Sequence, residues 1–596
     1  MKTRAPFAVS LLPLFIVWVG SFTLLLGGQA IAQGQTRASP SNEAEVVAQY
    51  NVMVPMRDGV RLSTDVYRPK GEGRYPTVLT RNPYSNGSGG IKGAKHWAAR
   101  GYALVIQDVR GRYDSDGKFY PYVNDANDGH DLLEWIARQP WSNGKVGMTG
   151  GSYMGSVQWL AALQKSPALV TIIPEVAPFD YYKDAVYPGG AFSLAARLEW
   201  ISYMGGRTAQ EGPFDLDRLH WHLPLKTMGM DAGMDLPVFR DWVAHPSHDD
   251  YWRRFDVQAQ VGNIDLPVLH IGGWFDAFLS GTLSSYQAMR TSSPSAASRA
   301  HQQLLIGPWH HRLNRGSKTG DIEFGAQATI DLSKVQVPWL DHWLQGKDNG
   351  VMEQAPVRIF VMGDNRWRDE QEWPLARTRY TKYYLHAGGD KSAAGGALDT
   401  SQPRGGKASA SYVYDPNNPV PTLGGGLLPI ALGPGPRDQS PLSQRTDILS
   451  FSTAPLERDT EVTGPLQVTL YASSSAPDTD FTAKLIDVHP DGKAYNFADG
   501  IIRARYRESF KEPRLIEPGK VYEYTINLVA TSNVFKRGHR IRVDISSSNF
   551  PRFDRNPNTG HAFGEDAELK PATQTIFYTR KYPSHITLPI IPRDAT

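Results

Sequence analysis

A serine in a glycine-rich turn is the side chain of this sequence best suited to do chemistry. Ser152 lies in the segment Gly150–Gly155, between a short strand predicted at residues 145–149 and a helical pattern at residues 153–164. A serine on a sharp strand-to-helix turn exposes its hydroxyl at the carboxyl edge of a sheet. The helix N-terminus beneath it offers N–H groups to a developing oxyanion. The turn therefore predicts a nucleophile for acyl transfer.

The motif by itself is imperfect. Met154 stands where the last glycine of G-x-S-x-G is expected, and Gly155 comes one residue later. An ordinary strand-to-helix turn fits the motif equally well, so the partners of Ser152 decide between the two interpretations.

An acyl-transfer serine needs a base and a carboxylate that orients the base. In α/β-hydrolases these follow the serine in the order acid, then histidine, each after a strand. Asp276 follows the apolar run 267–271, and His310 and His311 follow the run 302–306. The acid would hold the imidazole, which takes the serine proton and later delivers it to the leaving group. Asp265 precedes its strand, so we expect it at the opposite edge; spacing alone does not choose between the two histidines.

Short apolar runs that alternate with helical patterns predict a parallel α/β sheet around these residues. We expect a hydrolase domain over residues 48–178 and 259–350, interrupted at 179–258 by a helical cap. Trp200, Tyr203 and Trp221 of this insertion would either line a substrate pocket or pack the cap.

The last part of the chain has a different character. From about Val357, short runs of alternating apolar and polar residues are separated by Gly, Pro and Asn turns. They predict an all-β sandwich over residues 351–596, and we expect it to be a jelly roll. We count Val357–Met362 as its first strand, and we expect Pro419–Pro436 to form a long surface loop.

Composition excludes several classes of function. The chain has 596 residues, a net charge of +3 and no cysteine, which indicates several globular domains without disulfides or thiol chemistry. There is no long basic run, so we expect no nucleic-acid partner. The sequence shows no metal-ligand cluster and no phosphate-binding loop, so we predict no metal and no cofactor. Nothing in it fixes the oligomeric state, and a homo-oligomer is compatible with it.

The N-terminus predicts an export signal. Lys2 and Arg4 precede the apolar run Phe7–Leu26, and Ala30–Ala32 has the pattern of a cleavage site. We expect a signal peptide at residues 1–32, a flexible lead-in at 33–47, and a periplasmic or secreted protein without stable membrane association after cleavage. The run is long for a signal, so an uncleaved anchor is the alternative.

Several motifs together resemble the CocE/NonD hydrolase family, which includes cocaine esterase, α-amino-acid ester hydrolases, glutaryl-7-ACA acylases and X-Pro dipeptidyl-peptidases. The resemblance covers nearly the whole chain after the signal. The motifs that carry it are Arg81–Tyr84, Asp108–Arg112 running to Gly117, Gly150–Gly155 in the form G-x-S-Y-x-G, Gly273–Asp276, Gly307–His311 and Arg537–Arg542 with Ser547 and Asn549–Pro551.

The resemblance implies roles that spacing left open. The family's Gly-Pro-Trp-x-His motif makes His311 the base, and its Asn-Pro-Tyr turn makes the hydroxyl of Tyr84 an oxyanion donor. The second donor would be the backbone N–H of Tyr153, which follows the serine. The resemblance thus implies a serine hydrolase that works through an acyl-enzyme.

The substrate is less well defined by the sequence. Amino-acid ester hydrolases resemble this chain but carry carboxylates just after the triad aspartate, where this chain has Ala277–Ser280. Phe278 matches the apolar aromatic residue of the cocaine-esterase-like members, so we predict an apolar pocket, with Trp200, Tyr203 and Trp309 as further candidates. We favour small carboxylic esters, then amide or acylase activity, then X-Pro dipeptidyl-peptidase action. Three cap carboxylates could still bind a substrate ammonium: Asp184, Glu199 and Glu211. A secreted binding protein with an inactive hydrolase fold is the non-enzyme alternative.

Overall fold

The computed structural model describes residues 45–87, 90–210, 212, 215–231, 235–388, 395–405, 408–428 and 430–593. The expected signal peptide and nearly all of the expected lead-in lie outside these residues, as does Glu211. The lead-in was predicted to extend to residue 47, but the first strand already begins at Val46. No helix among the described residues combines the length and the apolar character needed to cross a bilayer.

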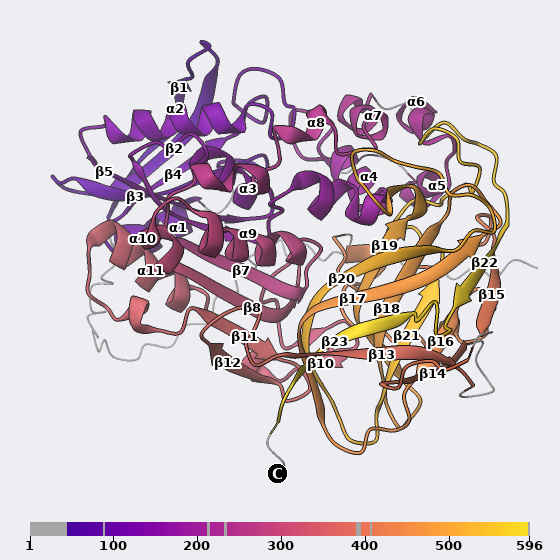
Figure 1. Cartoon of the computed structure of the whole chain (residues 1–596). Coiled ribbons are helices and arrows are strands. Elements are labelled where there is room, and N and C mark those ends of the chain that lie inside the picture. The colour runs from indigo at the N-terminus through magenta and orange to yellow at the C-terminus, as the bar shows by residue number, and fades with distance from the viewer. Residues whose placement is uncertain are drawn as a thin grey trace, which may run out of the picture. The chain divides into compact units, whose positions relative to one another are not determined.

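A mixed sheet forms the first part of the described chain. Its ten strands have the order β1-β2-β4-β3-β5-β6-β7-β8-β11-β12 (Figure 1). The seven strands from β4 to β11 in that order run parallel. The strands are β1 (Val46–Pro55), β2 (Arg61–Pro69), β3 (Tyr75–Asn82), β4 (Ala103–Asp108), β5 (Ser142–Gly151), β6 (Leu169–Glu175), β7 (Val268–Phe275), β8 (Gln302–His310), β11 (Val357–Val361) and β12 (Arg366–Glu370). A separate two-stranded sheet pairs β9 (Lys318–Thr319) with β10 (Ile322–Glu323).

Helices cover both faces of this sheet. Successive residues of a strand point to opposite faces, and Val105 and Leu104 accordingly lie in two different apolar cores. The first core contains residues of α2 (Asp125–Ala137) and α3 (Tyr153–Ala162), and the second contains residues of α1 (Gly90–Ala98) and α11 (Ser333–Gln345). The remaining helices of this part are α9 (Leu279–Ser292) and α10 (Ala296–Ala300). Burial on both faces explains why β4, β7 and β8 have nearly continuous apolar sequences.

The cap is helical, as predicted. It contains α4 (Leu194–Tyr203), α5 (Leu216–His220), α6 (Met228–Asp231), α7 (Pro237–Ala244) and α8 (Asp250–Arg253). Its side chains share an apolar core with α2 and α3, so the cap packs directly against the elements that surround Ser152.

A β-rich domain follows. Its eleven described strands have the order β15-β22-β17-β23-β13-β14-β16-β21-β18-β19, with β20 paired to β17. They are β13 (Arg379–Ala387), β14 (Gly395–Asp399), β15 (Ser409–Tyr414), β16 (Leu449–Ser452), β17 (Thr460–Ser474), β18 (Asp480–Val488), β19 (Ala494–Arg503), β20 (Tyr522–Phe535), β21 (Arg540–Ser546), β22 (Ala572–Phe577) and β23 (His585–Ile591). Alternate residues of these strands fill a core of their own. The predicted fold class, an α/β-hydrolase domain with a helical cap followed by an all-β jelly-roll sandwich, is confirmed.

Two details of the β-rich part were predicted wrongly. The run Val357–Met362 supplies β11, which pairs in parallel with β8 and so belongs to the first sheet. A short apolar run has the same pattern in a parallel sheet as in a sandwich. The segment Pro419–Pro436 is no surface loop, because Val420 and Leu427 within it are buried. Its Gly426 packs so closely on the carbonyl of Asp276 that a Cβ would lie 3.0 Å from that oxygen.

Candidate active site

Ser152 occupies a strained turn between β5 and α3. Its φ of 60° and ψ of −123° are values that a residue with a side chain rarely adopts. Its N–H donates to the carbonyl of Glu175 at 2.9 Å, which ties the turn to β6. A Cβ at Gly155 would lie 2.7 Å from the Cβ of Ala177, so the glycine after Met154 is the one this tight packing requires.

Asp276 and His311 are brought together at the ends of neighbouring strands. His311 Nδ1 lies 2.7 Å from Asp276 Oδ1, and the side chain of the aspartate is fully buried. Because Nδ1 is held by the carboxylate, Nε2 is the ring nitrogen left to exchange a proton with a substrate or a nucleophile. Asp265 is engaged elsewhere, where it accepts a hydrogen bond from Ser295.

A cavity of about 600 Å³ joins Ser152 and His311, and we call it the Ser152 cavity. This volume suits a small organic molecule. Its lining consists of Tyr84, Ser152, Ala196, Glu199, Trp200, Ser202, Tyr203, Gln210, Gly212, Leu216, His311, Arg312 and Leu428. His310 is absent from that set, and its Nδ1 accepts the N–H of Arg312 at 3.2 Å. Burial and the neighbouring His311 lower the pKa of His310.

Tyr84 lines this cavity next to Trp200. The indole N–H of Trp200 donates to the Tyr84 oxygen at 3.2 Å. An indole nitrogen can only donate, so the phenol proton of Tyr84 remains free for another acceptor. Burial raises the pKa of Tyr84 to about 12, and the phenol therefore keeps that proton at neutral pH.

The side chain of Tyr153 is used for support. Its hydroxyl donates to Asp125 Oδ2 at 2.6 Å, and Asp125 pairs with the buried Arg81 at 3.1 Å. The pKa of Asp125 is raised, mainly by burial, while Arg81 opposes the shift. Only the backbone N–H of Tyr153, in the first turn of α3, is available beside Ser152. Sequence reasoning missed Asp125, although Arg81 in the Arg-Asn-Pro-Tyr motif was a signal that a buried anion would be needed.

The predicted pocket residues divide into two groups. Trp200 and Tyr203 line the Ser152 cavity. Phe278 and Trp309 do not. Phe278 packs edge-on against the ring of His311, with the ring centroids 5.2 Å apart. Trp309 is buried in the core and donates to the carbonyl of Ala328 at 2.8 Å, because β8 directs its side chain into the second apolar core. Trp221 is 47% exposed and packs on Phe550. Leu428 was missed.

Of the two candidate carboxylates that the structure describes, Glu199 lines the cavity and Asp184 does not. Glu199 lines it together with Arg312, and burial raises the pKa of Glu199 while Arg312 opposes the shift. Asp184 instead accepts the N–H groups of Phe179 and Asp180 and the hydroxyl of Ser280. Glu199 therefore brings a carboxylate to the cavity from a position in the cap. Sequence spacing alone could not predict that this residue would lie near Ser152.

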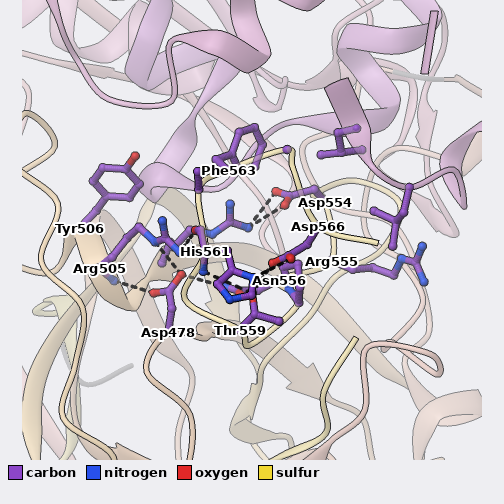
Figure 2. Close-up of a pocket in the computed structure, with 16 residues that line it drawn as sticks. Asp478, Arg505, Tyr506, Asp554, Arg555, Asn556, Thr559, His561, Phe563 and Asp566 are labelled. Carbon is purple, nitrogen blue, oxygen red and sulfur yellow. Dashed lines mark hydrogen bonds and ion pairs between the residues drawn. The ribbon is translucent and has the colours of Figure 1, made fainter. Parts of the chain in front are cut away.

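A second hollow lies between the cap and the sandwich, and its charged side chains form what we call the Arg503 cluster. Arg503 pairs with Asp480 and Asp554, Arg505 pairs with Asp478, and Asn556 donates to Asp478 and Asp480. Figure 2 shows Arg505 and Asn556 directed at Asp478. The hollow holds about 30 Å³, which is room for little more than one water molecule. It is a set of internal contacts and no second substrate site.

Comparison with known proteins shows the family to which this chain belongs. The sequence signature of X-Pro dipeptidyl-peptidase (S15 family) matches residues 58–312. The signature of the X-Pro dipeptidyl-peptidase C-terminal non-catalytic domain matches residues 349–587. Cocaine esterase of Rhodococcus sp. (strain MB1 Bresler) is 41% identical over 573 residues, which cover 91% of this chain and 98% of that protein.

Two solved structures have a similar fold. An aminopeptidase from a marine sediment archaeon, Thaumarchaeota archaeon, superposes with a TM-score of 0.82 at 28% identity, covering 94% of this chain and 99% of that one. An α-amino-acid ester hydrolase gives a TM-score of 0.81 at 28% identity, covering 94% and 98%.

The fold and the matched sequences define an α/β-hydrolase of the serine esterase type. The chain belongs to the X-Pro dipeptidyl-peptidase (S15) family of CocE/NonD hydrolases.

Proposed function

We propose that this chain hydrolyses carboxylic esters through a Ser152–His311–Asp276 triad and an acyl-enzyme. One observation carries the proposal: the serine of the strained turn and the carboxylate-bound histidine face a single cavity of about 600 Å³. The identity of 41% to an esterase supports the choice of esters.

The chemistry runs in two halves. Ser152 Oγ attacks the substrate carbonyl carbon while His311 Nε2 accepts the hydroxyl proton, and Asp276 stabilises the resulting imidazolium. The tetrahedral oxygen receives hydrogen bonds from the Tyr84 hydroxyl and the Tyr153 N–H. The C–O bond to the leaving alcohol breaks, and His311 gives that alcohol its proton. Water then attacks the acyl-enzyme in the same way, releasing the acid and restoring Ser152.

A panel of substrates tests the proposal. Protein lacking residues 1–32 is assayed with short-chain aryl esters, an aromatic acyl ester, a glutaryl amide and an Ala-Pro anilide, with Ser152→Ala as the blank. Rapid ester cleavage that Ser152→Ala abolishes, without loss of fold, is the expected result. A fluorophosphonate label should appear on Ser152 alone. Activity retained by Ser152→Ala would exclude the triad, and faster cleavage of the anilide or the amide would favour peptidase or acylase action.

Glu199 favours a second candidate, the hydrolysis of esters that carry a basic amine. Glu199 lines the Ser152 cavity together with Arg312, whose charge opposes the rise in the Glu199 pKa. No salt bridge to Glu199 is found among the described residues, so a substrate ammonium could pair with this carboxylate directly. A preference for amine-bearing over neutral esters of the same size tests this candidate.

We also propose export of the protein, on the strength of the N-terminal signal pattern. Cell fractionation of the full chain and of a chain without residues 1–32 tests it. Activity outside the cytoplasm only for the full chain is the expected result.

A further inference from the structure

The chain enters and leaves the cap through two segments that lie side by side, at Asp180 and Asp256, and we call this place the neck. Asp180 stands at the start of the cap and Asp256 at its end, and the two residues form an isolated antiparallel bridge. His248, which precedes α8, brings its imidazole to the same point. Asp180 from the start of the cap thus meets His248 and Asp256 from its end, where the cap joins the hydrolase domain.

The imidazole of His248 is directed at both carboxylates without bonding to either. Nε2 lies 3.8 Å from Asp180 Oδ1 and 3.6 Å from Asp256 Oδ2. Both distances exceed those of a hydrogen bond. The side chain is only 10% exposed, and its Nε2 has no hydrogen-bond partner among the described residues. A buried polar atom left without a partner is unfavourable and asks for an explanation.

The surrounding contacts hold the three groups in place. Asp180 Oδ1 accepts the N–H of Tyr182 at 3.0 Å, and Asp256 Oδ1 accepts that of Ala259 at 2.9 Å. The His248 ring stacks on the Tyr182 ring at 5.0 Å, and its backbone N–H donates to Phe510 at 2.8 Å. The group is therefore preorganised with its facing atoms apart, and those atoms lie within 4.8 Å of one another.

The separations are those of ligands that share one ion. Two donor atoms about 2.1 Å from the same metal lie roughly 3.6–3.8 Å apart when they subtend about 120–130°. An imidazole with two carboxylates suits zinc and other divalent transition metals, whereas calcium prefers oxygen ligands alone. We propose that Asp180, His248 and Asp256 bind a Zn²⁺ ion.

The ion would be structural. None of these three residues is among the described residues that line the Ser152 cavity. Binding would fasten the two chain segments of the neck to each other and to the segment that carries His248. Sequence analysis predicted no metal because ligands at positions 180, 248 and 256 show no recognisable spacing.

Lys183 is the competitor for this position. Its ammonium lies 2.9 Å from Asp180 Oδ2, and its side chain is 43% exposed. It can turn outward when a divalent ion arrives, because its stem already reaches solvent. Removing this charge should therefore strengthen zinc binding, a result that a purely structural histidine would not produce.

Metal titration tests the proposal. The purified protein is stripped with a chelator, and Zn²⁺ is added while bound metal and Tm are measured. The wild type should bind one equivalent that His248→Gln and Asp256→Asn both lose, and Lys183→Met should bind it more tightly. Saturation should raise the Tm of the wild type by roughly 2 °C or more, and that of the two ligand variants by less.

A second histidine group provides the matched control. Asp487, His489 and His539 lie together in the sandwich and could also take an ion. His489→Gln should leave the proposed equivalent of zinc unchanged. Loss of that equivalent in His489→Gln, with retention in His248→Gln and Asp256→Asn, would overturn the proposal. So would a wild type that binds no zinc. If His248→Gln fails to fold, the near-isosteric Asp256→Asn and the gain in Lys183→Met still decide.

Discussion

The cap contributes to two polar regions of opposite character. In the Arg503 cluster Arg503 and Arg505 pair with carboxylates, and the hollow between the groups holds only about 30 Å³. In the Ser152 cavity the phenol proton of Tyr84 and the carboxylate of Glu199 face about 600 Å³ of open space. Similar residue types therefore do different work. Where they satisfy one another they hold domains together, and where donors or charges are left free we propose that they bind a substrate.

The largest effect expected in the Ser152 cavity separates two adjacent histidines. His311→Ala should lower kcat/KM on an aryl ester on the order of 10⁴-fold or more, because the base is lost. His310→Ala is the matched control and should change the rate little, since its ring lies outside the cavity. Steady-state kinetics measures both, and the reverse ranking would exchange their roles.

The next largest effect belongs to the Arg503 cluster. Arg503 is 4% exposed between two carboxylates, and removing one partner of a buried ion pair costs about 3–5 kcal/mol. Arg503→Met should lower the free energy of unfolding by that amount, measured in urea, while kcat per folded molecule is kept.

The exposed pair of Lys520 with Glu517 serves as its control. Lys520→Met should leave the unfolding midpoint where it is. A loss of kcat in folded Arg503→Met would contradict the view that the Arg503 cluster acts on stability alone and the Ser152 cavity on catalysis.

Tyr84→Phe should show that a free donor in the cavity acts on the transition state. Loss of one oxyanion donor costs about 100-fold or more in kcat, and KM should change little because the ground-state carbonyl needs that bond less. Tyr203→Phe, which alters another hydroxyl of the same cavity, should leave kcat nearly unchanged. A change confined to KM would make Tyr84 a wall of the pocket.

The smallest effect concerns selectivity at Glu199. Glu199→Gln should reduce the preference for amine-bearing esters roughly tenfold, because one charge-assisted hydrogen bond is lost, while neutral esters are cleaved as before. Burial raises the pKa of this carboxyl. The preference should therefore be present above that raised pKa and decline as the pH falls through it. A pH series on the two ester types measures this, and equal loss for both types would remove Glu199 from substrate binding.

Much of this site could be predicted from local sequence. Ser152, Asp276 and His311 each follow a buried strand, and parallel strands end at one edge of a sheet. Their proximity therefore depends on chain order and on the positions of the strands, and both can be predicted from the sequence. The hydrolase sheet, the cap and the sandwich were predictable for the same reason, since each has its own apolar period.

What escaped prediction depends on contacts between distant segments. Trp309 and Trp200 are both tryptophans near a catalytic motif or cap, but only the packing of β8 shows that Trp309 points into the core. Leu428 reaches the cavity from a segment more than a hundred residues beyond His311. The direction in which a single side chain points, and the return of a distant loop to the cavity, produce no periodic pattern in a sequence.

The position of that loop changes how the protein can be engineered. A segment of the C-terminal domain supplies Leu428 to the cavity wall and packs Gly426 on the backbone of Asp276. The hydrolase domain and its cap consequently depend on the C-terminal domain to complete the cavity wall. Exchanging the sandwich with that of a relative would transplant part of the substrate specificity, and libraries that vary only the cap would leave one wall of the cavity unexplored.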